Sequence, residues 1–151
     1  MIYISYPSEA QEDVKEVFRK LRETFDVSLP EEREKLPKEN LPEKLREILG
    51  ESVLFLGEAS NPASDVEIEA GWANEMKIPI VLFLKFGRDY PKSLKDVHLR
   101  IIKYSTSEDL EIKVNKYLNE EFPEESKKEY YHYSDKKGYR GYKKGWKRKY
   151  S

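Results

Sequence analysis

Apolar residues in the first 120 positions alternate between short strand-like runs and stripes with helical spacing. The strand-like runs occupy residues 2–6, 25–29, 52–56, 78–84 and 99–104. Between them, apolar residues recur every three or four positions in residues 14–25, 41–49, 66–76 and 110–118. This alternation predicts an α/β domain whose parallel sheet is built through right-handed crossovers.

The run at residues 78–84 is almost entirely apolar, as expected of a central parallel strand that is covered on both faces. We therefore predict a five-stranded parallel sheet in the flavodoxin-like order 2-1-3-4-5, with helices on both faces. In that arrangement the ligand cleft lies beyond the carboxyl ends of strands 1 and 3, where residues 6–8 and 57–63 meet. Residues 30–39 are polar and contain flanking prolines, which predicts a loop.

Three of the predicted helices begin with a capping signal, in which a Ser or Asn is followed three residues later by Gln or Glu. The pairs are Ser8 with Gln11, Asn40 with Glu43, and Ser64 with Glu67. The last helix is expected to begin at Ser107 and to end at Leu118. These signals divide the sequence into regular strand and helix units.

The third of these helices has a carboxylate on its apolar side. On a helical wheel Glu69 lies between Val66 and Ala73, whereas Glu67 faces the opposite way. Burying an unpaired carboxylate costs several kcal/mol, so the side chain needs an explanation. One explanation is structural pairing to a buried Arg, Tyr or backbone N–H. We favour the other, a reactive carboxylate beside a cleft, because perturbed carboxylates cluster at functional sites.

Composition excludes several classes of protein. The chain has 151 residues, enough for one domain with a real core, and 38% of them are charged. No run approaches the roughly 20 apolar residues of a membrane-spanning helix, and the start shows no secretory signal. Cysteine is absent, which excludes disulfides, thiol catalysis and Cys-ligated zinc. We expect a cytoplasmic protein without membrane contact.

The net charge of −1 conceals a division of the chain. Residues 127–151 carry ten Lys and Arg against two acidic residues, a charge of +8, whereas residues 1–126 carry 18 basic and 27 acidic residues, a charge of −9. The basic segment has no Val, Ile, Leu, Met or Phe, so we predict a domain at 1–122 and a disordered tail at 123–151. Two roles for the tail remain open: its Lys, Arg, Tyr and Trp bind nucleic acid, or it folds back on the acidic body.

The sequence lacks the residues that several common kinds of catalytic site require. The two histidines, His98 and His132, lie in different regions, so a zinc site is not expected. The sequence has no Walker A loop, no G-x-G-x-x-G and no nucleophile elbow. We expect no metal and no dissociable cofactor, which leaves carboxylate chemistry.

A glutamate can attack an anomeric carbon and form a covalent glycosyl intermediate that water or another acceptor then resolves. Glu69 is the candidate nucleophile. Tyr3, in the first strand, and Glu58, in the loop after the third strand, are the polar groups expected to converge on it. An ordinary half-buried aromatic explains Tyr3 equally well, and a solvated loop acid explains Glu58 better.

Two motifs carry a resemblance to a known family. Residues 2–7 read I-Y-I-S-Y-P, close to an opening strand that typically reads I-Y-L-A-G-P, and residues 53–73 contain a strand, a loop and a helix with E-x-G at Glu69. In these motifs the chain resembles the nucleoside 2-deoxyribosyltransferases and the 2′-deoxynucleoside 5′-phosphate N-hydrolases, up to about residue 122. The resemblance implies cleavage or transfer of the N-glycosidic bond of a nucleoside-type substrate, with Glu69 as nucleophile and Tyr3 tuning it.

The chain departs from that family in the first loop and in the helix before the third strand. Tyr6 replaces a glycine and fills space where a ligand would approach. Ser8 and Glu9 stand where the hydrolases carry a phosphate-binding arginine, and the charge of Glu9 argues against a phosphorylated substrate. The family's second catalytic acid has no clear match, and Glu43 or Glu47 is the candidate to replace it.

A second resemblance, to TIR domains, is carried by I-S-Y-P-S-E at residues 4–9, the helix at 41–49 and S-D-V-E-I-E at residues 64–69. In NAD-cleaving TIR domains the catalytic glutamate would again be Glu69. The two resemblances therefore agree on the attacking residue and the type of bond. They differ on the substrate and on whether the domain signals by self-association.

We predict an N-glycosidase or glycosyltransferase with Glu69 and Tyr3 as catalytic residues. The expected substrate contacts are Tyr6, Ser8, Glu58, Asn61, Ser64 and Ser93. The family resemblance also implies a homo-oligomer in which residues around Arg88 and Ser93 complete a neighbouring site. The rival class is a non-catalytic module that binds nucleotide or RNA.

Overall fold

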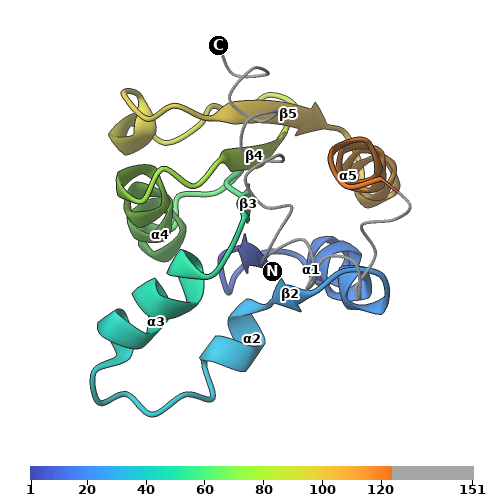
Figure 1. The fold of residues 1–151 in the computed structure, drawn as a ribbon. Helices are drawn as coiled ribbons and strands as arrows, with labels where there is room; N and C mark the ends of the chain where they lie inside the picture. Colours follow the sequence, from blue (N-terminus) through green and yellow to red (C-terminus); the bar gives the residue numbers. More distant parts are fainter. Residues whose placement is uncertain (124–151) are drawn as a thin grey trace.

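The computed structural model describes residues 1–123, which form a parallel sheet between two layers of helix (Figure 1). The strands are β1 (Ile2–Ser5), β2 (Val27–Ser28), β3 (Leu54–Glu58), β4 (Ile80–Lys85) and β5 (Arg100–Tyr104). Their order is β2-β1-β3-β4-β5, and each neighbouring pair is parallel. The predicted fold class and strand order are confirmed. The basic segment at residues 127–151 lies outside the described residues.

Helices cover both faces of the sheet (Figure 1). They are α1 (Glu12–Arg19), η1 (Lys20–Glu23), α2 (Pro30–Arg33), α3 (Leu41–Gly50), α4 (Ser64–Glu75), η2 (Lys92–Leu94) and α5 (Ser107–Glu121). Helices α1 and α5 lie on one face, and α3 and α4 lie on the other (Figure 1). None of the helices in residues 1–123 combines the length and apolar character that a membrane crossing requires.

Alternate residues of each strand pack into two separate cores. Ile2 and Ile4 contribute to the core under α1 and α5, whereas Tyr3 contributes to the core under α3 and α4. In the β1–β3 register, Ser5 lies opposite Gly57, where a Cβ atom would come within 2.9 Å of Leu82 Cδ2. This crowding explains why position 57 carries no side chain.

The three predicted capping boxes do not form, although Asn40 is the N-cap of α3 as predicted. The N-caps of α1, α3 and α4 are Gln11, Asn40 and Ala63, and none of them makes a side-chain cap hydrogen bond. Asn40 adopts left-handed φ of 58°, which turns the chain sharply before α3. Acidic residues in the first turn of these helices complement the helix dipole instead. Only α5 has a side-chain cap among these elements, where Thr106 accepts from the Asp109 N–H at 3.2 Å.

The prediction of a loop at residues 30–39 is also wrong at its beginning. Pro30 occupies the first turn of α2, and the Glu32 side chain accepts from the Leu29 N–H at 2.9 Å, so a short helix begins directly after β2. The helix turns Arg33 inward, where its side chain is only 6% exposed. A residue that the sequence pattern assigns to a polar loop thus becomes part of the interior.

Candidate active site

Glu69 lies on the buried side of α4, as the helical periodicity predicts. Its neighbours at helical spacing, Val66, Ala70 and Ala73, pack onto the sheet, and Glu69 itself is 8% exposed. The helix follows β3 and crosses over the carboxyl end of β1, which brings the carboxylate to the last residues of that strand. Glu69 therefore lies at the carboxyl end of β1 and not in the middle of the core.

Both carboxylate oxygens of Glu69 accept a hydrogen bond from β1. The Tyr3 hydroxyl donates to Oε2 and the Ser5 hydroxyl donates to Oε1, each at 2.7 Å. Tyr3 and Ser5 are two residues apart in a strand, so strand alternation places them on the same face. A carboxylate has about four lone-pair sites, so two donors fix its orientation and leave capacity for a ligand.

Tyr3 is fully buried, and its ring makes two close contacts. It stacks on Phe55 at a centroid distance of 5.7 Å, and the Arg33 guanidinium lies 3.8 Å from the ring centroid. Burial raises the pKa of the Tyr3 phenol far above its ordinary value, the charge of Arg33 opposes this rise, and Glu69 adds to it. Tyr3 therefore stays protonated and keeps donating to Glu69.

The sequence pattern missed both Ser5 and Arg33. Ser5 is 2% exposed and could have been found from its spacing, because it shares a strand face with Tyr3. Arg33 donates to the Ser28 carbonyl at 2.8 Å, to the Ser28 hydroxyl at 2.9 Å and to the Ile4 carbonyl. It thus joins the carboxyl ends of β1 and β2, and no local sequence pattern predicts this role.

A cleft of about 600 Å³ opens beside Glu69. This volume is within the range of pockets that hold small molecules. One wall is apolar and comes from α3 and α4, with Leu41, Leu45, Ile68 and Trp72. Ile68 is 50% exposed, and the Arg46 guanidinium lies 4.7 Å from the centroid of the Trp72 ring. Besides Glu69, the lining contains six charged residues: Lys15, Arg19, Glu31, Arg33, Glu34 and Asp65.

Tyr6 and Ser8 line this same cleft. The Tyr6 ring packs against Phe18 in the α1 core at 5.8 Å, and its hydroxyl donates to Glu31, which also lies 3.5 Å from Arg19. Burial and the bond to Glu31 raise the pKa of Tyr6. The ring belongs to the core on the opposite face of the sheet, and Tyr6 still borders the Glu69 cleft, so its predicted part in substrate contact stays a prediction.

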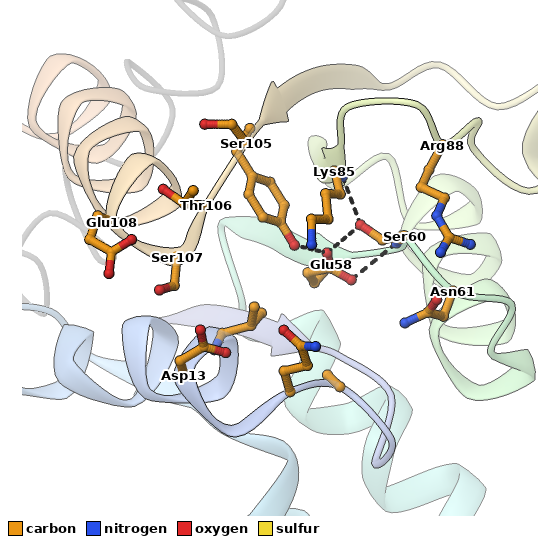
Figure 2. Close-up of a pocket in the computed structure, with 14 residues that line it drawn as sticks. Asp13, Glu58, Ser60, Asn61, Lys85, Arg88, Ser105, Thr106, Ser107 and Glu108 are labelled. Atoms are coloured by element: carbon orange, nitrogen blue, oxygen red, sulfur yellow. Dashed lines mark hydrogen bonds between the residues drawn. The ribbon is translucent and has the colours of Figure 1, made fainter.

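Glu58 does not join Glu69. It is the last residue of β3 rather than a loop residue, and strand alternation turns it toward the α1 and α5 side. Figure 2 shows its own cleft, of about 410 Å³, where it accepts from the Tyr104 hydroxyl and from both the N–H and the hydroxyl of Ser60. Burial and the hydrogen bond to Glu58 raise the pKa of Tyr104. At 2% exposure Glu58 is a buried carboxylate, not a solvated loop acid.

The other predicted contacts are also dispersed. Asn61 lines the Glu58 cleft (Figure 2). Ser93 donates to Glu67 and lines a neighbouring hollow near η2, and Arg88 lines both this hollow and the Glu58 cleft. The side chain of Ser64 lies outside what the structure describes. Glu43 and Glu47, the candidate replacements for a second acid, are exposed on α3 and do not line the Glu69 cleft.

The arrangement around Glu69 suits attack by a carboxylate on an electrophilic carbon. The carboxylate is oriented by two hydroxyl donors, borders open space, and has a guanidinium behind its tyrosine partner. Within residues 1–123, no group of three or more His, Asp or Glu side chains is placed to hold a metal ion. Asp65, one turn before Glu69 on α4, supplies a second carboxylate to the same cleft.

Comparison with known proteins finds a solved structure of similar fold. No family model matches the chain, and no curated protein matches it. Among solved structures, the Clostridium botulinum CMP N-glycosidase BcmB matches with a TM-score of 0.59 and 19% identity. The match covers 77% of this chain and 99% of that chain. At this identity the comparison establishes a shared fold, which is the fold that the motifs in residues 1–122 implied.

Proposed function

We propose that the protein cleaves or transfers the N-glycosidic bond of a nucleoside-type substrate, with Glu69 as the nucleophile. The observation that carries the proposal is the double hydrogen bond from Tyr3 and Ser5 to a carboxylate that borders a cleft of about 600 Å³. A carboxylate buried for structural reasons alone has no need of the adjoining space. The shared fold with a CMP N-glycosidase supports the same reaction type.

The reaction proceeds in two displacements. In the first, one Glu69 oxygen attacks the anomeric carbon, the bond to the base nitrogen breaks, and its electron pair leaves with the base. The base takes a proton from water. In the second, water or another base attacks the same carbon, the bond to Glu69 breaks, and its electron pair returns to the carboxylate. A proton from the attacking water passes to solvent.

The lining of the cleft fits such a substrate. The sugar lies against Glu69, and the planar base lies along the apolar wall, where Ile68 and Trp72 offer contact area without fixed hydrogen bonds. Lys15 and Arg19 also line the cleft, while Glu9 is exposed and does not line it. A 5′-phosphate therefore has possible partners, and phosphorylated substrates belong in the test.

The test measures base release from a panel of nucleosides, each offered with and without a 5′-phosphate. Wild-type protein is expected to release base from at least one of them. Glu69→Gln should lower the rate by about 10³-fold or more, since the nucleophile is lost. Glu58→Gln is the matched control, because Glu58 is equally buried and also bonded to a tyrosine and a serine. Its rate should stay within about threefold of wild type.

A trapped intermediate makes the assignment specific. A 2-fluoro-sugar nucleoside slows the second displacement, so intact mass should rise by one glycosyl unit in wild type and not in Glu69→Gln. Equal loss of activity in both glutamate variants would contradict the assignment to Glu69.

NAD is included in the panel because the TIR-like resemblance concerns the same residue. Release of nicotinamide without release of any nucleobase would favour that alternative. Release of nothing at high protein concentration would favour a non-catalytic binding module. Homo-oligomer formation and nucleic-acid binding by residues 127–151 stay predictions, which sedimentation and retention on a polyanion column test directly.

A further inference from the structure

Arg33 is a buried cation without an ion-pair partner. It is 6% exposed, and among the ion pairs within residues 1–123 none involves it. Its hydrogen bonds go to neutral acceptors, the carbonyls of Ile4 and Ser28 and the Ser28 hydroxyl. Burying a charge of this kind carries a large desolvation cost, so the position of Arg33 calls for an explanation.

The field of Arg33 is directed at Tyr3. The guanidinium carbon lies 3.8 Å from the centroid of the Tyr3 ring, and the hydroxyl of that ring donates to Glu69 at 2.7 Å. A positive charge on the ring face draws electron density from the phenol and strengthens its O–H as a donor. Arg33 also lines the Glu69 cleft, so the row of contacts from Arg33 through Tyr3 to Glu69 lies at the site itself.

The two displacements respond to such a field in opposite ways. In the first, Glu69 gives up its negative charge to form the bond to the sugar, and a stronger donor on Oε2 does not help. In the second, the carboxylate leaves with its electron pair, and a stronger donor stabilises the departing charge. A cation behind Tyr3 therefore favours release of the sugar from the protein.

We propose that Arg33 is a positioning residue that acts through Tyr3 on Glu69 and accelerates the second displacement. The proposal rests on the proposed function. Arg33 lies in a four-residue helix, outside both motifs of the family resemblance. In this proposal it controls how fast the covalent intermediate breaks down.

The experiment compares the first turnover with later turnovers in Arg33→Gln. Glutamine keeps an N–H donor for the Ile4 or Ser28 carbonyl but removes the charge. Base release should show a burst close to one equivalent of protein, followed by a steady rate about tenfold below wild type. Intact mass during turnover should show accumulated glycosyl-protein. Adding a second base as acceptor should raise the steady rate more in this variant than in wild type.

Two further variants test whether the effect is electrostatic and passes through Tyr3. Arg33→Lys keeps the charge and should recover most of the steady rate, although its ammonium cannot lie flat on the ring. In a Tyr3→Phe background, Arg33→Gln should cause no further change in the ratio of burst to steady rate. If Arg33→Gln does not fold, Arg33→Met in both backgrounds carries the test, because it also removes the charge, whereas the lysine variant keeps it.

Arg22→Gln is the matched control, since Arg22 donates to the Val27 carbonyl of the same strand at 3.1 Å and belongs to no described contact with Tyr3. Its burst and steady rates should equal those of wild type. A proportional loss of burst and steady rate in Arg33→Gln, together with a lower melting temperature, would overturn the inference and leave a structural role. If wild-type protein releases no base, the proposed function fails and this inference fails with it; an active wild type with an unchanged ratio in Arg33→Gln defeats this inference alone.

Discussion

The hydrogen bond between Tyr3 and Glu69 can be measured through stability, independently of activity. Tyr3→Phe removes only the hydroxyl. The ring keeps its stacking on Phe55 at 5.7 Å and its contact with Arg33 at 3.8 Å, so the substitution leaves the packing of the β1 end in place. What is lost is a 2.7 Å bond from a fully buried donor to a carboxylate that is 8% exposed.

A hydrogen bond to a charged group contributes about 1.5–3 kcal/mol, and the Ser5 bond remains in Tyr3→Phe. We therefore expect the free energy of unfolding to fall by about 2 kcal/mol, or about 4–8 °C in melting temperature for a chain of this size. In a Glu69→Gln background the bond is between neutral groups and contributes about 1 kcal/mol. The coupling energy of the double-mutant cycle should then be about 1 kcal/mol. Glu69→Gln alone should raise the melting temperature, since a desolvated charge is removed.

The assay is urea unfolding of wild type, both single variants and the double variant, followed by circular dichroism. Tyr104→Phe combined with Glu69→Gln is the control cycle, because Tyr104 bonds to Glu58 in the other cleft and shares no partner with Glu69. That cycle should be additive within about 0.5 kcal/mol. A coupling below about 0.5 kcal/mol for Tyr3 and Glu69 would refute the reasoning that their bond holds the carboxylate.

Three other outcomes are expected. Ser5→Ala should reduce base release by about 10-fold with unchanged KM, because the second donor that orients Glu69 is lost, and full activity in this variant would show that Tyr3 alone suffices. The Ser105 N–H and then Lys113 lower the pKa of Asp109, so its stabilisation is present above the unfolded pKa of about 4 and is lost as pH falls through the folded value. Asp109→Asn should accordingly melt below wild type at pH 7, with a gap that narrows as the pH falls below about 4, and a pH-independent gap would argue against the ionic contribution. Gly57→Ala should cost about 1–3 kcal/mol of unfolding free energy, because its Cβ would meet Leu82 at 2.9 Å. Gly50→Ala, with open space in α3, should instead stabilise the protein by about 0.5–1 kcal/mol. Equal effects of the two substitutions would show that the sheet has room for a side chain at position 57.

Local periodicity was sufficient to predict the strands, the helices and the inward direction of Glu69, because each depends on spacing within one element. The order of the strands was predicted from the alternation of strands and helices and from the flavodoxin-like arrangement. The end of β3 was harder to locate: with the strand ending at residue 56, Glu58 appears as a free loop acid. Because the strand continues to Glu58, alternation places that carboxylate with Leu54 and Leu56, on the face opposite Phe55.

Arg33 could not be predicted in the same way. Its burial depends on the carbonyls at the ends of β1 and β2, which are far from one another in sequence and adjacent only in the folded sheet. A charged residue in a proline-bounded polar stretch is normally solvated, and nothing in its neighbours indicates otherwise. Long-range backbone contacts, unlike periodicity, leave no local mark in a sequence.

The residues around the carboxylate come from two sides of one exposed connection. Tyr3, Ser5 and Arg33 precede the polar segment between α2 and α3, and Glu69 follows it. A single peptide cut near Lys38 would thus yield two fragments, one with the hydroxyl donors and the guanidinium, the other with the acid. Mixing separately inactive fragments should restore base release only as β1 of one fragment pairs with β3 of the other, so the protein could serve as a split reporter of fragment reassembly.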